Sequence, residues 1–199
     1  MQLTGKQIVN KGIIYNVDEK GIQQQGVDVR IKRISKVSSG LQNGINMFSD
    51  LFMGKSEMSI VEDMFANTGL IPCSGKTSIP KTMEVLPISN PDSGTKTWYL
   101  HEGYYEVEFM EGCKIPADCA MYFKTRSSLV RCGADIRSGQ FDGGFETENM
   151  GAFLKVELPI RIEVGARVAQ AIVSETYPVD EDKMYNGQWQ NDNQRNSQS

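Results

Sequence analysis

Short hydrophobic runs separated by turn-forming residues dominate this chain. Near the N-terminus, residues 13–17 and 26–34 alternate apolar and polar positions, which is a strand pattern. Further short β-branched or aromatic runs cover residues 98–100, 104–109, 120–123, 153–158, 160–164 and 168–174. Because Gly, Pro and Asp separate these runs, the pattern predicts an all-β barrel or sandwich.

Three segments depart from the strand pattern. Residues 4–11 predict a short helix, with Thr4 as N-cap and with Ile8 and Val9 on its inner face. Residues 38–92 mix Gly, Ser and Asn with scattered apolar groups, and 61–65 fit a helical turn. The polar tail, residues 191–199, has little apolar area to bury, so we expect it to be disordered unless a ligand orders it.

These segments predict one domain, residues 1–190, with an insertion near residues 38–95. The insertion either covers one side of the barrel or acts as a lid. An apolar flap that packs on the core or on a neighbouring subunit is the favoured interpretation. A chain of 199 residues is long enough to bury a full core.

Composition narrows the classes of partner. The net charge of −4 and the pI near 5.2 indicate no basic face for nucleic acid. The four cysteines lack CxxC spacing, and the chain has one histidine, which argues against a disulfide framework, a zinc site or a Ser-His triad. No signal-peptide pattern and no apolar run near 18 residues occurs, so we expect a cytoplasmic protein that does not enter a membrane.

The stretch 126–145, RSSLVRCGADIRSGQFDGGF, carries the densest candidate chemistry. Arg126 followed by two serine hydroxyls can bind phosphate oxygens, and Asp142 beside two glycines can orient an attacking water. Two ordinary structural interpretations remain open. The serines can cap a helix that starts after Ser128, and Asp142 can be a solvated residue in a β-hairpin turn.

The motifs RSSLVR and GQFDGGF resemble the central motifs of the dCTP deaminase and dUTPase superfamily. Other segments match in the same order: QGVDVR at 25–30, YLHEG at 99–103, IPAD at 115–118, LPI at 158–160, GARVAQ at 165–170 and YNGQWQ at 185–190. The resemblance covers about residues 1–35 and 98–190 and is strongest to the deaminase branch. It implies a distorted jelly-roll barrel that assembles as a homotrimer with active sites shared between subunits.

The resemblance also implies roles for individual residues. Arg126, Ser127 and Ser128 would hold the triphosphate, and Arg131 would lie near the base and its reacting water. Asp142 would lie near the sugar, where dUTPases use this aspartate to orient the water that attacks the α-phosphorus. The remaining substrate-binding candidates are Ser138, Gly139, Gln140 and Phe141 around the base, Gln170 on a core strand, and Tyr185, Gln188 and Gln190 in a segment that closes over the nucleotide, where Trp189 would cover the site.

One position departs from the deaminase pattern. The catalytic glutamate of that branch, counted without gaps from Phe145, falls on Ala152, which cannot shuttle protons. Glu146, Glu148 and Glu157 are the alternatives. We therefore favour dUTP hydrolysis to dUMP and pyrophosphate, with Mg²⁺ bridging the substrate phosphates and bound by no protein ligand directly. A mono- or bifunctional dCTP deaminase and a non-catalytic nucleotide- or partner-binding relative remain the alternatives.

Overall fold

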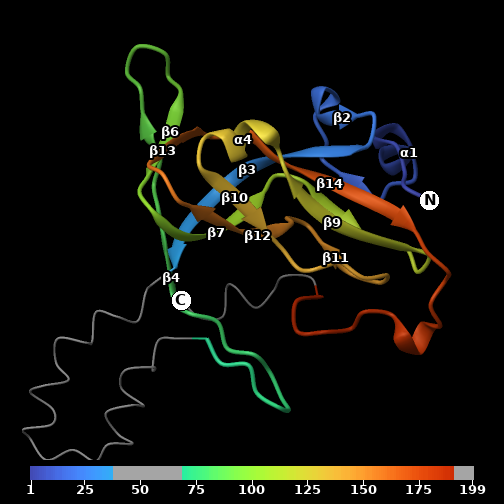
Figure 1. The fold of residues 1–199 in the computed structure, drawn as a ribbon. Coiled ribbons are helices and arrows are strands. Elements are labelled where there is room, and N and C mark those ends of the chain that lie inside the picture. Colours follow the sequence, from blue (N-terminus) through green and yellow to red (C-terminus); the bar gives the residue numbers. More distant parts are fainter. Residues whose placement is uncertain (38–68, 191–199) are drawn as a thin grey trace, which may run out of the picture. The chain divides into compact units, whose positions relative to one another are not determined.

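The computed structural model describes residues 1–37 and 69–190 (Figure 1). The chain divides into two compact units, residues 1–35 with 84–199, and residues 36–83. The elements, in chain order, are α1 (Gly5–Asn10), β1 (Ile14–Tyr15), η1 (Glu19–Gly21), β2 (Ile22–Gln23), β3 (Gly26–Val37), β4 (Thr82–Glu84), β5 (Ile88–Ser89), β6 (Lys96–Leu100), β7 (Gly103–Phe109), β8 (Gly112–Lys114), β9 (Cys119–Thr125), α4 (Ser127–Arg131), β10 (Ala134–Arg137), β11 (Glu146–Thr147), β12 (Gly151–Val156), β13 (Ile160–Glu163), β14 (Arg167–Glu175) and η3 (Glu181–Lys183).

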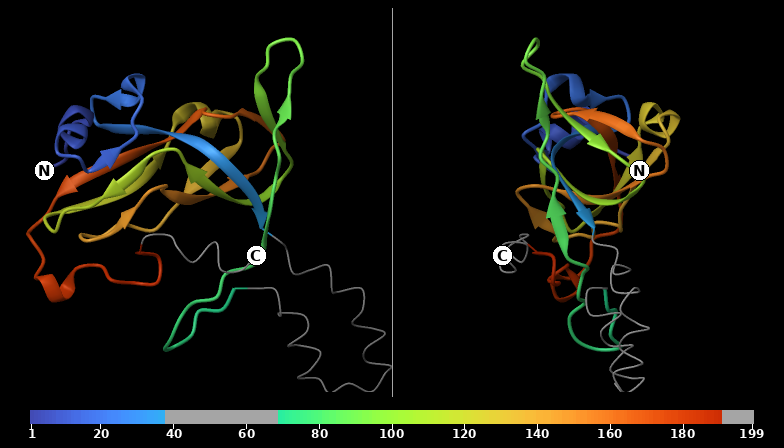
Figure 2. Two further views of the ribbon diagram at one scale, coloured as in Figure 1. Left: turned by 180° about the vertical axis from the view of Figure 1, so that it is seen from behind. Right: turned by 90° about the vertical axis from the view of Figure 1, so that its left-hand side faces the viewer.

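The larger unit is a nearly closed β-barrel, as the strand pattern predicts. Its main sheet has the strand order β10-β12-β7-β3-β14-β9. The two ends of this sheet meet, because the Ile136 backbone N–H donates to the Thr125 hydroxyl at 3.0 Å. The view along the barrel shows the resulting ring (Figure 2). Two smaller sheets, β1-β8-β11 and β13-β6-β5, complete the unit.

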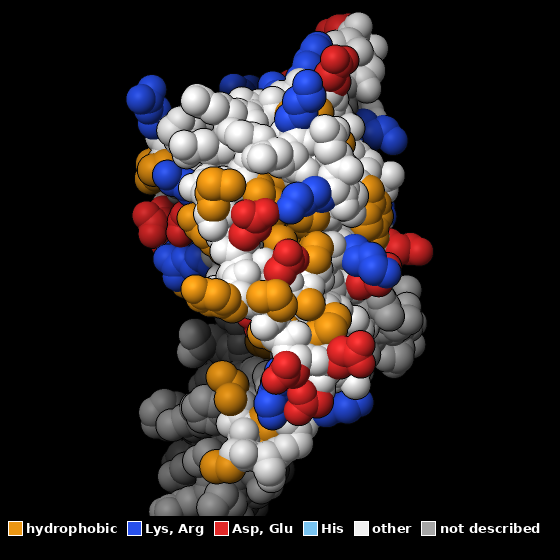
Figure 3. All heavy atoms as spheres, turned by 90° about the vertical axis from the view of Figure 1, so that its right-hand side faces the viewer, with side chains coloured by type: hydrophobic (Ala, Val, Ile, Leu, Met, Phe, Trp, Pro, Cys, Tyr) orange, Lys and Arg blue, Asp and Glu red, His pale blue; other side chains and the backbone are white. Residues whose placement is uncertain are grey.

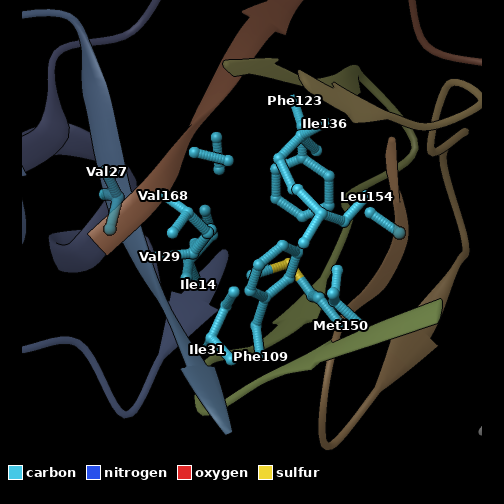
Figure 4. Packing of buried hydrophobic residues seen from close by; sticks show 14 of the residues in the cluster. Ile14, Val27, Val29, Ile31, Phe109, Phe123, Ile136, Met150, Leu154 and Val168 are labelled. Carbon is cyan, nitrogen blue, oxygen red and sulfur yellow. The ribbon is translucent and has the colours of Figure 1, made fainter. Parts of the chain in front are cut away.

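Alternation along the strands fills the barrel with apolar side chains. In β7 and β12 every second residue is buried, so that Val107, Phe109 and Leu154 point inward. Figure 4 shows Phe109, Phe123, Ile136 and Leu154 converging from four strands, together with Met150, which precedes β12. Burying this apolar surface is the main favourable contribution to the stability of such a fold.

The predicted strands are all present, with shifted bounds. Residues 13–17 form only the two-residue β1, whereas 26–34 extends into the twelve-residue β3. The run predicted at 153–158 ends as a strand at Val156. The backbone bends there, because the N–H groups of Glu157 and Leu158 both donate to the Gly133 carbonyl.

The N-terminal helix is confirmed. The Thr4 hydroxyl accepts from the Gln7 backbone N–H, and the Gln7 side chain accepts from the Thr4 backbone N–H in a capping box. Ile8 is fully buried and Val9 packs against the core, as expected for the inner face.

The insertion predicted near residues 38–95 spans both units. Its residues 84–95 belong to the barrel unit, where the Trp98 indole N–H donates to the Val85 carbonyl at 2.8 Å. In the smaller unit, Leu70 and Ser78 pair as an antiparallel bridge. The helical turn predicted at 61–65, the lid interpretation of 38–68 and the disorder predicted for 191–199 concern residues outside those described.

Within the described residues, no helix is both long and apolar enough to cross a membrane. The face of the barrel unit shown in Figure 3 mixes hydrophobic, acidic and basic side chains.

Candidate active site

A cavity of about 540 Å³ opens beside the N-terminus of α4. Three strands build its floor, since the register places Gln170 of β14 opposite both Asp28 of β3 and Lys124 of β9. The alternate residues on these strands, Val27, Phe123 and Ala171, point into the core. The cavity is lined by Gln23, Asp28, Lys124, Thr125, Arg126, Ser127, Val130, Arg131 and Gln170.

Asp28 lies at the centre of the charges in this cavity. It is 3% exposed, and its carboxylate lies 3.3 Å from the Arg126 Nε and 3.9 Å from an Arg167 guanidinium nitrogen. Burial raises the pKa of the Asp28 carboxyl, while the two arginines partly oppose this shift. Among the described residues, its Oδ2 is the buried side-chain oxygen without a hydrogen bond. This oxygen faces the Arg126 and Arg167 guanidinium groups, whose positive charge compensates that of the buried carboxylate.

The structure brings four of the predicted site residues together. Arg126, Ser127, Arg131 and Gln170 all line the cavity around Asp28. The Arg126 side chain is also held by a hydrogen bond from Nη1 to the Arg167 carbonyl, 3.1 Å long. Ser128 instead lines a second cavity, which borders β6 and β13.

The interpretation of the serines as helix caps is wrong. Helix α4 begins at Ser127, so both serines lie within its first turn, and Arg126 occupies the N-cap position without a side-chain cap. The serine hydroxyls are therefore free of the capping role that sequence alone allowed. Their exposure leaves them available to a ligand in the adjoining cavities.

Asp142 lies in a turn whose flanking segments pair with other strands. Phe141 forms a bridge with Met121 of β9, and β11 pairs with β8, so the predicted β-hairpin around Asp142 is wrong. Gly144 has φ of +93°, a conformation that favours glycine, and it closes the turn. The Gln140 side-chain amide donates to the Asp142 carboxylate at 2.9 Å. Asp142 is exposed, with one oxygen held in place by this bond.

The residues predicted around the base divide into two groups. Ser138, Gly139 and Gln140 are exposed on the segment between β10 and the bridge at Phe141. The Phe141 ring packs edge-on between Phe123 and Phe145, with ring centroids 5.3 and 5.2 Å away. It therefore belongs to the edge of the hydrophobic core.

The C-terminal segment lies directly on the Asp142 turn. The Tyr185 backbone N–H donates to the Gly143 carbonyl at 2.8 Å, and the Gln190 side-chain amide donates to the Gly144 carbonyl at 2.8 Å. The Trp189 backbone N–H donates to the Tyr185 hydroxyl at 3.2 Å. Of the predicted closing residues, Tyr185 and Gln190 thus contact the turn that carries Asp142. Gln188 is partly buried in the same segment.

The candidate residues form two separate clusters within one chain. The residues that line the cavity around Asp28, which we call the phosphate cluster, adjoin the end of β9 at Arg126. The Asp142 turn is attached to the same strand at Met121. Five residues of extended strand separate these two points, or roughly 16 Å at about 3.3 Å per residue. The two clusters therefore lie apart within one chain.

The candidate glutamates lie in different surroundings. Ala152 of β12 is 6% exposed and pairs with Val107 of β7. Its side chain faces the core, as does that of Leu154. Glu146 forms an ion pair with Lys114 at 2.9 Å, and Glu148 is exposed. The exposed Glu157 donates its backbone N–H to Gly133, two residues beyond Arg131. It is thus the alternative that the backbone ties most directly to the phosphate cluster.

Asp28 lines the cavity but was not among the site residues predicted from sequence. The QGVDVR segment signalled its strand, and a charged residue between two buried valines was a usable signal. Its contact with Arg126 depends on pairing between strands far apart in sequence, so no local pattern indicates it.

Comparison with known proteins identifies the family. Residues 2–176 match the model of the dCTP deaminase-like family, and the chain belongs to it. A probable deoxyuridine 5'-triphosphate nucleotidohydrolase of Methanosarcina barkeri is 28% identical over 166 residues, which cover 81% of this chain and 93% of that protein. The deoxyuridine 5'-triphosphate nucleotidohydrolase of Methanocaldococcus jannaschii is 29% identical over 166 residues, 83% of this chain and 86% of that protein.

A solved structure shares the fold. The 2'-deoxycytidine 5'-triphosphate deaminase of Agrobacterium tumefaciens superposes with a TM-score of 0.51 at 13% sequence identity. The match covers 86% of this chain and 48% of the deaminase, so this chain spans about half the length of that protein.

Proposed function

We propose that this protein hydrolyses dUTP to dUMP and pyrophosphate. The observation that carries the proposal is the cavity in which Arg126, Arg131, Lys124 and the Ser127 hydroxyl surround a small polar space. Cations and hydroxyl donors in that arrangement suit a triphosphate. Membership in the dCTP deaminase-like family, and relatives named as dUTP nucleotidohydrolases, support the same substrate class.

In the proposed reaction, Asp142 orients a water molecule. Its carboxylate, held by Gln140, accepts a hydrogen bond from the water and withdraws a proton as the water oxygen attacks the α-phosphorus. The bond from the α-phosphorus to the bridging oxygen breaks, and pyrophosphate leaves. Arg126 and Ser127 bind the phosphate oxygens and stabilise the charge that develops on them, and Arg131 lies near the base and the reacting water.

The residues present also fit Mg²⁺ held through the substrate. Magnesium keeps most of its waters and binds phosphates, and the Lys124, Arg126 and Arg131 side chains that line the cavity suit the substrate phosphates that would hold the ion. The bound ion would neutralise phosphate charge. We further propose a homotrimer, in which the phosphate cluster of one chain meets the Asp142 turn of another.

Replacement of Asp142 tests the proposed reaction. Asp142→Asn should keep the fold and the affinity for dUTP but lower the rate of pyrophosphate release by about 10²–10⁴-fold, because an amide is a weak base. The rate is measured by coupled detection of pyrophosphate, with Asp92→Asn, an exposed aspartate in the β5–β6 turn, as control. Full pyrophosphate release by Asp142→Asn would show that this aspartate is not the base.

Deamination of dCTP is the second candidate activity. The observation that favours it is the hydrogen bond from the Glu157 backbone N–H to the carbonyl of Gly133, which lies two residues after the end of α4. The same assay run with dCTP and an ammonia readout separates the two activities. Ammonia release by the unmodified protein would assign deamination, and Glu157 would then be the residue to replace first.

A further inference from the structure

A continuous row of aromatic rings links the barrel core to the C-terminal segment. It runs through Phe109, Phe123, Phe141, Phe145 and Tyr185, each ring meeting the next edge-on. Successive ring centroids are 5.0, 5.3, 5.2 and 5.4 Å apart. Phe109 is fully buried, so the row begins in the rigid interior of the barrel. Edge-on pairs at such distances are favourable beyond the apolar area they bury.

This row brackets the Asp142 turn. Phe141 precedes Asp142 by one residue and Phe145 follows it by three, so both ends of the turn are anchored in the row. The Phe145 backbone N–H donates to the Asp142 carbonyl at 3.1 Å and closes the turn. Tyr185 is the outermost ring and packs on Phe145 from the solvent side.

Backbone hydrogen bonds attach the C-terminal segment to the same turn. The two ends of the Gln190 amide are both used, since Nε2 donates to the Gly144 carbonyl and Oε1 accepts from the Glu146 backbone N–H at 3.3 Å. The Tyr185 backbone N–H bonds to Gly143. In this structure these groups therefore hold protein backbone, so they are not directed at a phosphate.

The turn leaves no space for a side chain beneath the segment. A Cβ on Gly144 would lie 3.0 Å from the Met184 Cβ and 3.1 Å from the Tyr185 backbone nitrogen. A Cβ on Gly143 would lie 3.0 Å from the Ala117 Cα on the other side. The two glycines are thus enclosed between the barrel and residues 184–190.

We propose that Tyr185 is a positioning residue for Asp142. Residues 184–190, which we call the C-terminal strap, hold the turn in the geometry that aims the carboxylate at the reacting water. The proposal rests on the hydrolytic function proposed above. It assigns the strap an effect on the chemical step, distinct from direct binding of substrate phosphates.

The division between kcat and KM tests this role. Tyr185→Ala should lower kcat for pyrophosphate release from dUTP by roughly 10- to 100-fold, because small displacements of a catalytic group cost that much in rate. KM should change little. Tyr185→Phe keeps the ring contact and should stay near the wild-type rate, as should Tyr177→Ala, which removes a fully exposed tyrosine upstream. A rise in KM with unchanged kcat would overturn the proposal.

A double variant shows whether Tyr185 acts through Asp142. If it does, Tyr185→Ala should have little further effect on kcat in the Asp142→Asn background, because the group that it positions is already disabled. Multiplicative losses would mean that Tyr185 contributes independently and would contradict the positioning role.

Limited trypsin digestion without nucleotide tests attachment of the strap separately from catalysis. Lys183, which is exposed in η3, immediately precedes the strap. Cleavage after Lys183, followed by mass spectrometry, should be several-fold faster in Tyr185→Ala and Gln190→Ala than in wild type or Tyr177→Ala. Equal cleavage rates would overturn the proposal. Absence of pyrophosphate release by wild type would instead overturn the proposed function, and the digestion would still report whether the strap is attached.

Discussion

At the scale of single residues, the phosphate cluster is arranged around the buried carboxylate of Asp28. A carboxylate that is 3% exposed is costly unless it is paired, and here Arg126 and Arg167 supply the pairing. The same contacts restrict the Arg126 guanidinium before any phosphate binds. The Arg126-Ser127 motif was recognisable from sequence, but the acidic residue that holds the arginine was not, because it belongs to a strand about a hundred positions earlier.

The pH dependence of stability tests this description of Asp28. Its folded-state pKa is raised, so between the ordinary value near 4 and the raised value the native state binds more protons than the unfolded chain. The free energy of unfolding of wild type, relative to that of Asp28→Asn, should therefore fall as pH rises through this window and level off above it. Urea unfolding of both proteins at several pH values measures the difference. A relative stability that rises with pH would mean that the two arginines outweigh burial.

At the scale of elements, alternation and turn residues were sufficient to predict the long strands. Strands such as β7 and β14 bury every second residue or nearly continuous apolar runs, which the sequence displays directly. The short strands β8, β10 and β11 carry too few residues for a period to be visible. Their pairing is set by contacts across the barrel, which also explains why a hairpin was wrongly predicted at Asp142.

The direction of Ala152 in β12 has a testable consequence. Counting along the sequence places the deaminase glutamate at this position, but the strand turns its side chain into the core. Ala152→Glu should therefore destabilise the fold by about 3–5 kcal/mol, as an unpaired buried charge does, and should not create a proton shuttle. Chemical denaturation checks this, with Phe153→Gln on the outward face of the same strand as control. Wild-type stability combined with ammonia release from dCTP would contradict it.

At the scale of the whole molecule, the barrel separates two sets of functional groups. The phosphate cluster lies at one end of β9, and the Asp142 turn with the C-terminal strap is attached toward the other. The order of motifs in the sequence pointed to both sets as candidates but could not show that they lie apart, since distance within a barrel depends on strand pairing. The shared site proposed above would bring the phosphate cluster of one chain to the Asp142 turn of another.

Shared sites make a prediction about mixed oligomers. Light scattering should first show a particle of three times the 22.2 kDa chain mass.

The mixing experiment uses two variants. Arg126→Ala should weaken triphosphate binding by about 1.5–3 kcal/mol, the usual contribution of a hydrogen bond to a charged group, and Asp142→Asn should be nearly inactive. When equal amounts of the two variants are unfolded and refolded together, random assembly should give about a quarter of the sites an intact phosphate cluster from one chain and an intact Asp142 from another.

The pyrophosphate release rate of the mixture distinguishes the two arrangements when it is measured at a dUTP concentration near the wild-type KM, at which Arg126→Ala is largely unoccupied. Sites built from two chains should recover about a quarter of wild-type activity, because each variant supplies the half-site that the other lacks. Sites contained in one chain should give no more than the mean of the two variants refolded separately. Each variant taken alone through the same unfolding and refolding is the control for losses in that procedure. A mixture no more active than that mean, or a monomer that turns over dUTP, would rule out the shared site and require Asp142 to approach the phosphate cluster of its own chain.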